Sequence, residues 1–582
     1  MTLALHGITV SRGIALSRAL VWDSAFNDVP RTRIGKKSVR EEKRRFDNAI
    51  KIATKELDLL KSQLTQDGPP ELDAFLNLHI LILQDPTLCE LPKDLIAEKM
   101  INAEWALVQQ MEVVLEQFAS IKDDYFRERN ADVRQVCERV LKALSGRTIN
   151  MPLPPDDGTE DPWLIVAHDI SPADMVQLKG RKVGAFVTEL GGATSHTAIV
   201  ARSLGIPAVV GIPRVLEYIH NGDFVVVDGK VGVVFLDPAE LVIEEYRRKQ
   251  AILLLVRQRL KKLKNTETTT ACGRRIHLLA NIELPNDIDN VVDSGADGVG
   301  LFRSEFLFMN RREWPSEEEQ FEAYRHVVKA MKGLPVTVRT LDLGADKTLQ
   351  FDANSTGPVV STTSALGLRS IRFSLAEPAV FLTQIRAILR ASKYGEIKIL
   401  LPMLTNILEV EQALIYIQLA YEQLAARKIY VKHKVQIGGM IEVPAAALSL
   451  THFLRFLDFI SIGTNDLIQY TLAVDRVDHQ VAHLYDPLHP AILRLIYEVI
   501  AQADKNQIPV SVCGEMAGDL RLTRLLLGMG LTLFSMHPSQ LLDIKELLLK
   551  TEFDTTQKLV RSICRGFEPE KIAKVMTQLA VD

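Results

Sequence analysis

One histidine lies in a setting that suits it to carry an anionic group. His196 falls within GGATSHTAIVARSLGIPAVVG at residues 191–211, where two glycines allow a tight turn and Thr194 and Ser195 are good helix N-caps. In the first turn of a helix, free backbone N–H groups and the helix dipole favour an anion, such as a phosphoryl group on imidazole. Imidazole is also a competent nucleophile near neutral pH. The alternative, which local chemistry alone favours slightly, is a histidine that only helps cap the helix.

A second group of candidate residues lies at the ends of short apolar runs, or in the connections between them, in the C-terminal half of the chain. They are Arg303, Arg339, Arg369, Glu442, Asn465, Asp466, Arg476 and Cys513. Singly, each has a simple explanation as a surface ion pair or as buried packing. Together, the arginines suit a small, highly anionic substrate, and two carboxylates from neighbouring runs suit Mg²⁺. The set predicts a metal-assisted site for phosphate or carboxylate.

The apolar runs themselves indicate how these residues are positioned. Eight runs alternate with helix-like stretches over residues 276–283, 298–305, 336–343, 397–404, 436–444, 459–466, 509–516 and 531–537. Eight strand–helix alternations over about 300 residues predict a parallel (β/α)8 barrel of the TIM type, with its chemistry at the carboxyl ends of the strands. No short repeat accompanies the alternation, which disfavours a solenoid.

The first half has a different texture. Strand-like runs are found within residues 3–22 and again at 163–167, 183–188, 208–210 and 224–227. From about residue 39 to residue 144, between the first strand-like runs and the later ones, apolar residues recur at helical spacing. We therefore expect an α/β multidomain protein in which an N-terminal β/α domain carries an all-helical insertion. A charged helical stretch over residues 238–264, followed by a polar run at 266–270, predicts a connector to the barrel.

Bulk composition excludes several classes of protein. The chain has 582 residues, 47% hydrophobic and 24% charged, with a net charge of -4, so two to four globular domains are expected. The charge gives no reason to expect nucleic-acid binding, the N-terminus does not read as a signal peptide, and no apolar stretch approaches the ~20 residues of a membrane span. Five scattered cysteines without a CxxC pair predict reduced thiols and a cytoplasmic protein.

Several motifs carry a family resemblance. The His196 segment resembles the phosphohistidine motif of Enzyme I of the bacterial phosphoenolpyruvate-dependent sugar phosphotransferase system, and of the related phosphoenolpyruvate synthases and pyruvate phosphate dikinases. GVGLFRSEFLFM, VRTLDLGADK, ALGLRSIR, GGMIEVPAA, SIGTNDLIQYTLAVDR and VCGEMAGD resemble the barrel motifs of that family, in the same order. The resemblance runs from GITVSRGIAL near residue 7 to FSMHP near residue 538.

The resemblance implies a role for each candidate residue. His196 would be phosphorylated and Cys513 would donate a proton, while Glu442 and Asp466 would hold Mg²⁺. The residues in contact with phosphoenolpyruvate would be Arg303, Arg339, Arg369, Asn465, Asp466 and Arg476. The phosphoryl group would pass from phosphoenolpyruvate, with release of pyruvate, to His196 and then to the phosphocarrier protein HPr, as the first step of sugar phosphotransfer.

The resemblance also names the expected domains and the assembly. Residues 1–35 and 147–237 would form the phosphohistidine β/α domain, residues 36–146 the HPr-binding insertion, residues 238–270 the linker helix and residues 271–582 the phosphoenolpyruvate-binding barrel. Members of the family dimerise through the barrel, so a homodimer is expected.

Some positions depart from the family pattern. Ala193 stands where arginine is common, Arg12 where proline is frequent and Ala345 where glycine is usual, while Thr363 and Ser364 replace Asn-Pro. None of them removes a residue assigned to chemistry, so an active enzyme is expected.

Two other functions fit the sequence less well. A dikinase or synthase needs an additional nucleotide-binding domain, for which the residues before His196 leave little room, and no GxxxxGK[ST] loop occurs. A non-enzymatic regulator would not need the intact set of site residues. Whether the downstream carrier serves sugar uptake or regulation stays open, and the lack of an N-terminal sensory domain mildly favours the sugar-type enzyme.

Overall fold

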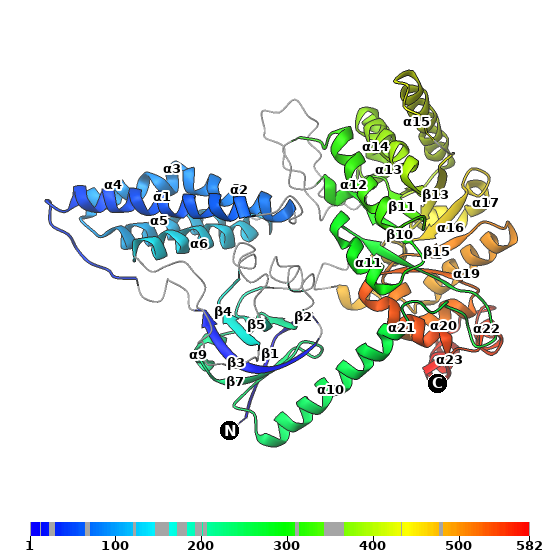
Figure 1. Cartoon of the computed structure of the whole chain (residues 1–582), viewed down its shortest axis with the longest axis horizontal. Coiled ribbons are helices and arrows are strands. Elements are labelled where there is room, and N and C mark those ends of the chain that lie inside the picture. The colour runs from blue at the N-terminus through cyan, green and yellow to red at the C-terminus, as the bar shows by residue number, and fades with distance from the viewer. Residues whose placement is uncertain are drawn as a thin grey trace. The chain divides into compact units, whose positions relative to one another are not determined.

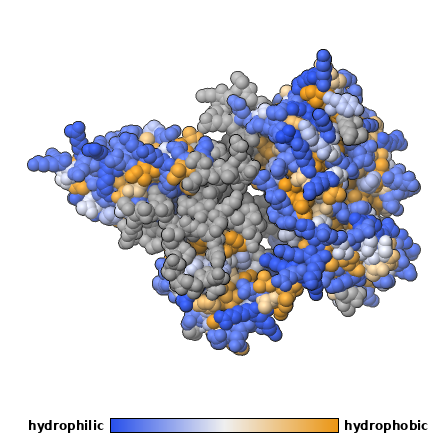
Figure 2. All heavy atoms as spheres, in the orientation of Figure 1, coloured by the Kyte–Doolittle hydropathy of each residue, from blue (hydrophilic) through white to orange (hydrophobic). Residues whose placement is uncertain are grey.

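The computed structural model divides into two compact units, Met1–Val256 and Arg257–Asp582 (Figure 1). It describes the chain except for residues 1, 12, 23–28, 64–69, 120–123, 146–161, 171–182, 192–200, 202–205, 309–312, 343–365, 432–433, 476–480 and 581–582. Hydrophilic residues cover much of the visible described surface, with apolar patches between them (Figure 2).

Eight parallel strands close into a barrel in the second unit. They are β9 (His277–Ile282), β10 (Val299–Arg303), β11 (Val336–Arg339), β12 (Ile397–Leu401), β13 (Gln436–Ile441), β14 (Phe459–Ile462), β15 (Val510–Val512) and β16 (Leu533–Met536). Each falls inside one of the predicted runs, because buried parallel strands are nearly continuous in apolar residues. The predicted (β/α)8 barrel is confirmed.

Helices surround this barrel and bury its outer face. They are α11 (Ile288–Ser294), α12 (Glu317–Ala330), α13 (Ser370–Ala376), α14 (Pro378–Ala391), α15 (Ile407–Ala426), α16 (Pro444–Leu448), α17 (Leu450–Phe453), α18 (Thr464–Leu472), α19 (Pro490–Lys505), α20 (Leu520–Gly528), α21 (Pro538–Leu549), α22 (Phe553–Arg561) and α23 (Pro569–Ala580). Capping boxes begin α12 at Ser316 and α15 at Asn406, each closed by a glutamate three residues later. One continuous apolar core joins strands and helices.

The first unit contains an eight-stranded mixed sheet in the order β1-β8-β7-β3-β4-β5-β6-β2. The strands are β1 (Leu3–His6), β2 (Ile8–Ser11), β3 (Ile14–Trp22), β4 (Trp163–Ala167), β5 (Val183–Thr188), β6 (Ala208–Val210), β7 (Phe224–Asp228) and β8 (Val233–Leu236). Strands β3 to β6 are parallel, whereas β1, β2, β7 and β8 pair antiparallel. The short helix α9 (Val215–Tyr218) follows β6.

A helical segment separates β3 from β4 in sequence, as predicted. Its helices are α1 (Val39–Gln63), α2 (Pro70–Gln84), α3 (Pro86–Cys89), α4 (Leu91–Lys99), α5 (Ala103–Ala119) and α6 (Asp124–Leu144). They share a core of their own around Phe46, Leu57, Leu76 and Leu107. Within the described residues, no helix is both long enough and apolar enough to cross a membrane.

The charged stretch after β8 forms one helix, α10 (Glu240–Lys262). The polar run at 266–270 differs from the linker that its sequence predicts, because Thr268 and Thr270 are buried. The backbone N–H of Ile276 donates to the Thr268 carbonyl at 2.9 Å, and that of Ala271 donates to the Thr551 carbonyl at 3.0 Å. Alternate β-branched residues of this run therefore pack as a strand does, and the run is part of the second unit.

Phe302 tests the packing of the barrel. It is fully buried in β10, and its ring meets Tyr324 of α12 edge-on at a centroid distance of 5.8 Å. We expect Phe302→Ala to lower the free energy of unfolding of the second unit by about 3–5 kcal/mol, since it leaves a cavity. A urea titration read by peptide-resolved hydrogen exchange measures this loss. The exposed Val292→Ala on α11 is the control, expected to change it by less than about 0.5 kcal/mol; equal effects would contradict the described packing.

Candidate active site at the barrel mouth

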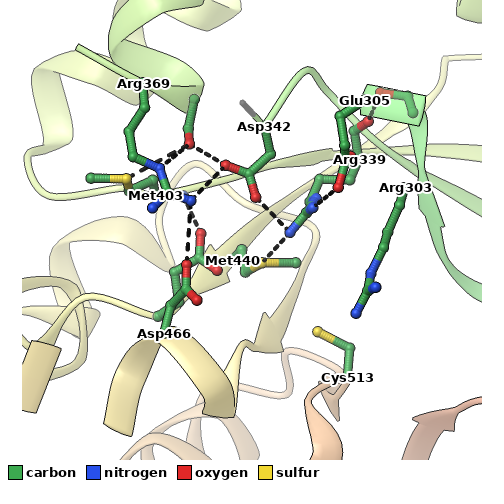
Figure 3. A network of polar contacts seen from close by, with 12 residues as sticks. Arg303, Glu305, Arg339, Asp342, Arg369, Met403, Met440, Asp466 and Cys513 are labelled. Atoms are coloured by element: carbon green, nitrogen blue, oxygen red, sulfur yellow. Dashed lines mark hydrogen bonds and ion pairs between the residues drawn. The ribbon is translucent and has the colours of Figure 1, made fainter. Parts of the chain in front are cut away.

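The carboxyl ends of strands β9 to β16, here called the barrel mouth, hold a buried charge cluster. Arg339, the last residue of β11, is almost wholly buried. Its guanidinium pairs with Glu305 and, at 2.7 Å, with Asp342 (Figure 3). Both carboxylates are as buried as the arginine, so each charge has its partner within the protein rather than in water. Removal of one partner would leave a buried charge uncompensated.

A second arginine continues the network. Arg369, just before α13, donates to Asp342 at 3.3 Å and lies 3.5 Å from a carboxylate oxygen of Asp466 (Figure 3). It also donates to the Tyr470 hydroxyl at 3.2 Å. Asp342 therefore accepts from two guanidinium groups, and Arg369 joins β11 to α18.

Glu442 follows β13 and is buried beside this network. Its Oε1 accepts from the backbone N–H of Met403 at 2.5 Å. Burial, together with the nearby charges of Asp466 and Asp342, raises the pKa of Glu442 to about 8, although Arg339 opposes the shift. A carboxylate of this kind gains more than an ordinary one from an added positive charge.

Two residues in the mouth have left-handed backbones without being glycine. Ser370 has a φ of 53° and Met403 a φ of 54°, conformations that cost about 1 kcal/mol or more each. Each is fixed by the charge cluster, since the Ser370 hydroxyl donates to Asp342 and the Met403 N–H donates to Glu442.

Cys513 and Arg303 lie on the other side of the mouth. Cys513 directly follows β15 and is buried, with its Sγ 3.6 Å from the Ile462 carbonyl oxygen. Burial raises the pKa of the Cys513 thiol to about 11, and the charges of Arg339 and Arg303 only partly offset this shift. In Figure 3 the Arg303 side chain extends towards Cys513. The thiol is therefore protonated at neutral pH and has a cation nearby.

Asn465 is held from the loop after Cys513. Its Oδ1 accepts from the backbone N–H of Glu515 at 2.9 Å, and its Nδ2 donates to the Glu515 carboxylate at 3.5 Å. The packing here needs glycine at 514, because a Cβ there would lie 1.9 Å from the Thr464 hydroxyl oxygen. The accepting atom of the Asn465 amide is thereby occupied, and the second N–H of its Nδ2 is the group that can donate to an anion.

The donor set of the mouth fits a divalent cation. Glu442 and Asp466 follow neighbouring strands and offer hard oxygen ligands, which Mg²⁺ binds together with waters and substrate oxygens. A Cβ on Gly463 would lie 2.7 Å from Oε2 of Glu442, so the space beside that oxygen depends on glycine. Among the described residues, no group of three or more His, Cys, Asp or Glu side chains is arranged to hold a metal. Beyond these two carboxylates, further ligands would come from waters, from the substrate or from residues outside the described part of the chain.

The structure brings most of the predicted residues to one place. Figure 3 shows Arg303, Arg339, Arg369, Asp466 and Cys513 around the mouth. Glu442 lies near Asp466 and Arg339, and Asn465 contacts Glu515, which follows Cys513 by two residues. His196 and Arg476 lie outside the described residues, as do Arg12, Ala193, Ala345, Thr363 and Ser364. Sequence reasoning missed Glu305, Asp342 and Tyr470. Asp342 gave a usable signal, because it is an acidic residue three positions after Arg339, at the end of the same predicted run.

Three family models match the chain. Residues 6–129 match the N-terminal domain of PEP-utilising enzymes, residues 159–232 their mobile domain and residues 257–553 their PEP-binding domain.

Similar proteins cover the chain at full or nearly full length. A phosphoenolpyruvate-protein phosphotransferase of Cupriavidus necator is 49% identical over all of both chains. A protein of the same name from Listeria monocytogenes is 38% identical over all of both chains. Another from Bacillus subtilis is 39% identical over 94% of both chains. Within the class of PEP-utilising enzymes, the chain belongs to the phosphoenolpyruvate-protein phosphotransferase family.

The contrast between two thiols tests the electrostatics of the mouth. Cys272 is exposed, and a hydrogen bond with the Thr270 hydroxyl lowers its pKa, whereas Cys513 is buried with its pKa raised to about 11. Because the thiolate is the reactive form, iodoacetamide should modify Cys272 first, and Cys513 only as the pH rises towards 11. Peptide mass spectrometry of each site over time measures both rates. Equal modification at neutral pH would mean that Cys513 is not shielded as described.

Proposed function

We propose that this chain transfers the phosphoryl group of phosphoenolpyruvate to its own His196, releases pyruvate, and passes the group to the phosphocarrier protein HPr. The reaction is the first step of a sugar phosphotransferase system. The observation that carries the proposal is the barrel mouth, where Arg339 and Arg369 lie beside Glu442, Asp466 and Cys513 in a chain of this family.

The mouth has the chemistry to hold phosphoenolpyruvate. The proposed contacts are Arg303, Arg339, Arg369, Asn465, Asp466 and Arg476. Guanidinium groups bind phosphate and carboxylate bidentately, and the N–H₂ group of Asn465 adds a neutral donor. Because Arg339 and Arg369 are already fixed by Asp342, they need little reorganisation when the substrate arrives.

We propose Mg²⁺ as the metal, held by Glu442 and Asp466. When bound, the ion supplies charge neutralisation at the phosphoryl oxygens. It would also relieve the mutual repulsion of Glu442, Asp466 and Asp342, the effect that, after burial, raises the pKa of Glu442.

In the transfer step, a neutral nitrogen of His196 attacks phosphorus in line with the bridging oxygen. The bond from phosphorus to that oxygen breaks, and its electron pair leaves with the enolate of pyruvate. The Cys513 thiol then gives its proton to the methylene carbon, which yields pyruvate and a thiolate that solvent reprotonates. A thiol whose pKa is about 11 is fully protonated before the step, as a proton donor must be.

His196 belongs to the first unit and the barrel mouth to the second, so the cycle requires the two units to come together and separate. We propose residues 1–35 and 147–237 as the phosphohistidine domain and residues 36–146 as the HPr-binding insertion. The proposed linker is residues 238–265, because the run 266–270 packs in the second unit. Ile52 and Leu59, seven residues apart on α1, expose apolar side chains of the kind that a protein partner covers.

We propose that the chain forms a homodimer through the barrel. Leu408, Ile415 and Leu419 are exposed at spacings of seven and four residues on α15, and Leu448 is exposed on α16. This spacing puts the three α15 residues on one helix face. The compartment proposed is the cytoplasm, in keeping with five cysteines that are all free thiols.

Labelling with phosphoenolpyruvate that carries radioactive phosphorus tests the function. The wild-type protein with Mg²⁺ should acquire acid-labile, alkali-stable label and release one pyruvate per label. His196→Ala should bind phosphoenolpyruvate with unchanged affinity and acquire no label, because nucleophile and substrate contacts belong to different units. Cys272→Ser is the matched control and should label normally. Stable labelling of His196→Ala would assign the nucleophile elsewhere.

A further inference from the structure

An acidic residue outside the buried cluster holds one of the proposed substrate contacts. Glu283 directly follows β9 and Arg303 ends β10, and these strands pair so that Ile282 lies beside Phe302. Nη1 of Arg303 donates to Oε1 of Glu283 at 2.6 Å. The other guanidinium N–H groups of Arg303 donate no hydrogen bond to the described part of the chain. Glu283 is therefore the side chain that holds this guanidinium here.

This pair differs in burial from the pairs of Arg339. The side chains of Arg303 and Glu283 are 32% and 48% exposed, whereas those of Arg339 and Glu305 are 10% and 0% exposed. A buried pair is needed because neither charge can be left alone out of water. An exposed pair contributes little to stability, since water solvates either partner once they separate. The bond between Glu283 and Arg303 is thus one that can open without harm to the fold.

The described residues of the mouth carry more acidic than basic groups, which opposes the binding of an anionic ligand. Carboxylates outnumber guanidinium groups among the described residues there, since Glu283, Glu305, Asp342, Glu442, Asp466 and Glu515 accompany Arg303, Arg339 and Arg369. Most of these acids have a structural or metal-binding reason to be present. Glu283 supports no buried partner, and it lies against the arginine that extends towards Cys513 (Figure 3).

We infer that Glu283 sets the affinity for substrate by competing with it for Arg303, an inference that rests on the function proposed above. In the empty mouth Glu283 neutralises Arg303. An anionic substrate displaces that carboxylate or binds beside it against repulsion, so binding is weaker than Arg303 alone would give. The pair forms again when the product leaves, which favours release of the pyruvate anion. Glu283 is a positioning residue in this role, since it acts through Arg303.

Calorimetric titration of phosphoenolpyruvate with saturating Mg²⁺ tests this inference. The parent is the full chain carrying His196→Ala, so that binding is measured without turnover. Adding Glu283→Gln should lower the Kd about threefold to fivefold, the scale of an exposed ion pair, with an unchanged melting temperature. An unchanged Kd would overturn the inference, and a raised Kd would show that Glu283 anchors Arg303 for the substrate instead.

The matched control is Asp293→Asn, which also removes one negative charge from an exposed pair in the second unit, the one with Lys264 at 3.1 Å. Its Kd should equal that of the parent. If Asp293→Asn tightened binding as much as Glu283→Gln, the effect would come from net charge alone and the inference would fail. A parent that does not bind phosphoenolpyruvate at all would contradict the proposed function, a different outcome from any of these.

Discussion

Arg339 carries a positive charge into the interior of the barrel mouth, and its partners there are Glu305 and Asp342. None of the three can be solvated by water, so the positions of β11 and of the segments that follow β10 and β11 are tied to one another. Asp342 also pairs with Arg369, and Arg369 pairs with Asp466 on α18, so the position of α18 depends on the same network. Residues from separate strand ends are thereby fixed as one group before any ligand arrives.

This arrangement has an electrostatic consequence for ligands. The arginines are neutralised by carboxylates of the protein, and the described mouth holds more carboxylates than guanidinium groups. Among the described residues, an anionic substrate would therefore meet little free positive charge until a cation bound at the proposed site of Glu442 and Asp466. The raised pKa of Glu442, which follows from burial and from its acidic neighbours, has the same cause, a shortage of free positive charge in the mouth. Metal and substrate should accordingly bind with positive coupling.

The sequence was sufficient for much of the architecture. Buried strands such as β4 and β12 are short apolar runs with polar ends, so their positions could be predicted, and the order of motifs placed Glu442, Asp466 and Cys513 at strand ends. The partners of the buried arginine Arg339 could be found in this way only in part. Glu305 meets Arg339 because β10 pairs with β11, a contact that the sequence does not show, whereas Asp342 lies three residues after Arg339 in the same run. Thr268 and Thr270 read as a polar linker because burial depends on tertiary contacts.

A titration of substrate against metal measures the coupling between Mg²⁺ and phosphoenolpyruvate. The Kd of phosphoenolpyruvate should be measured at increasing Mg²⁺ concentration in the His196→Ala protein and in the same protein with Glu442→Gln. Mg²⁺ should lower the Kd by about tenfold or more in the first protein and have little effect on it in the second. Equally tight binding without Mg²⁺ in the first protein would contradict the coupling.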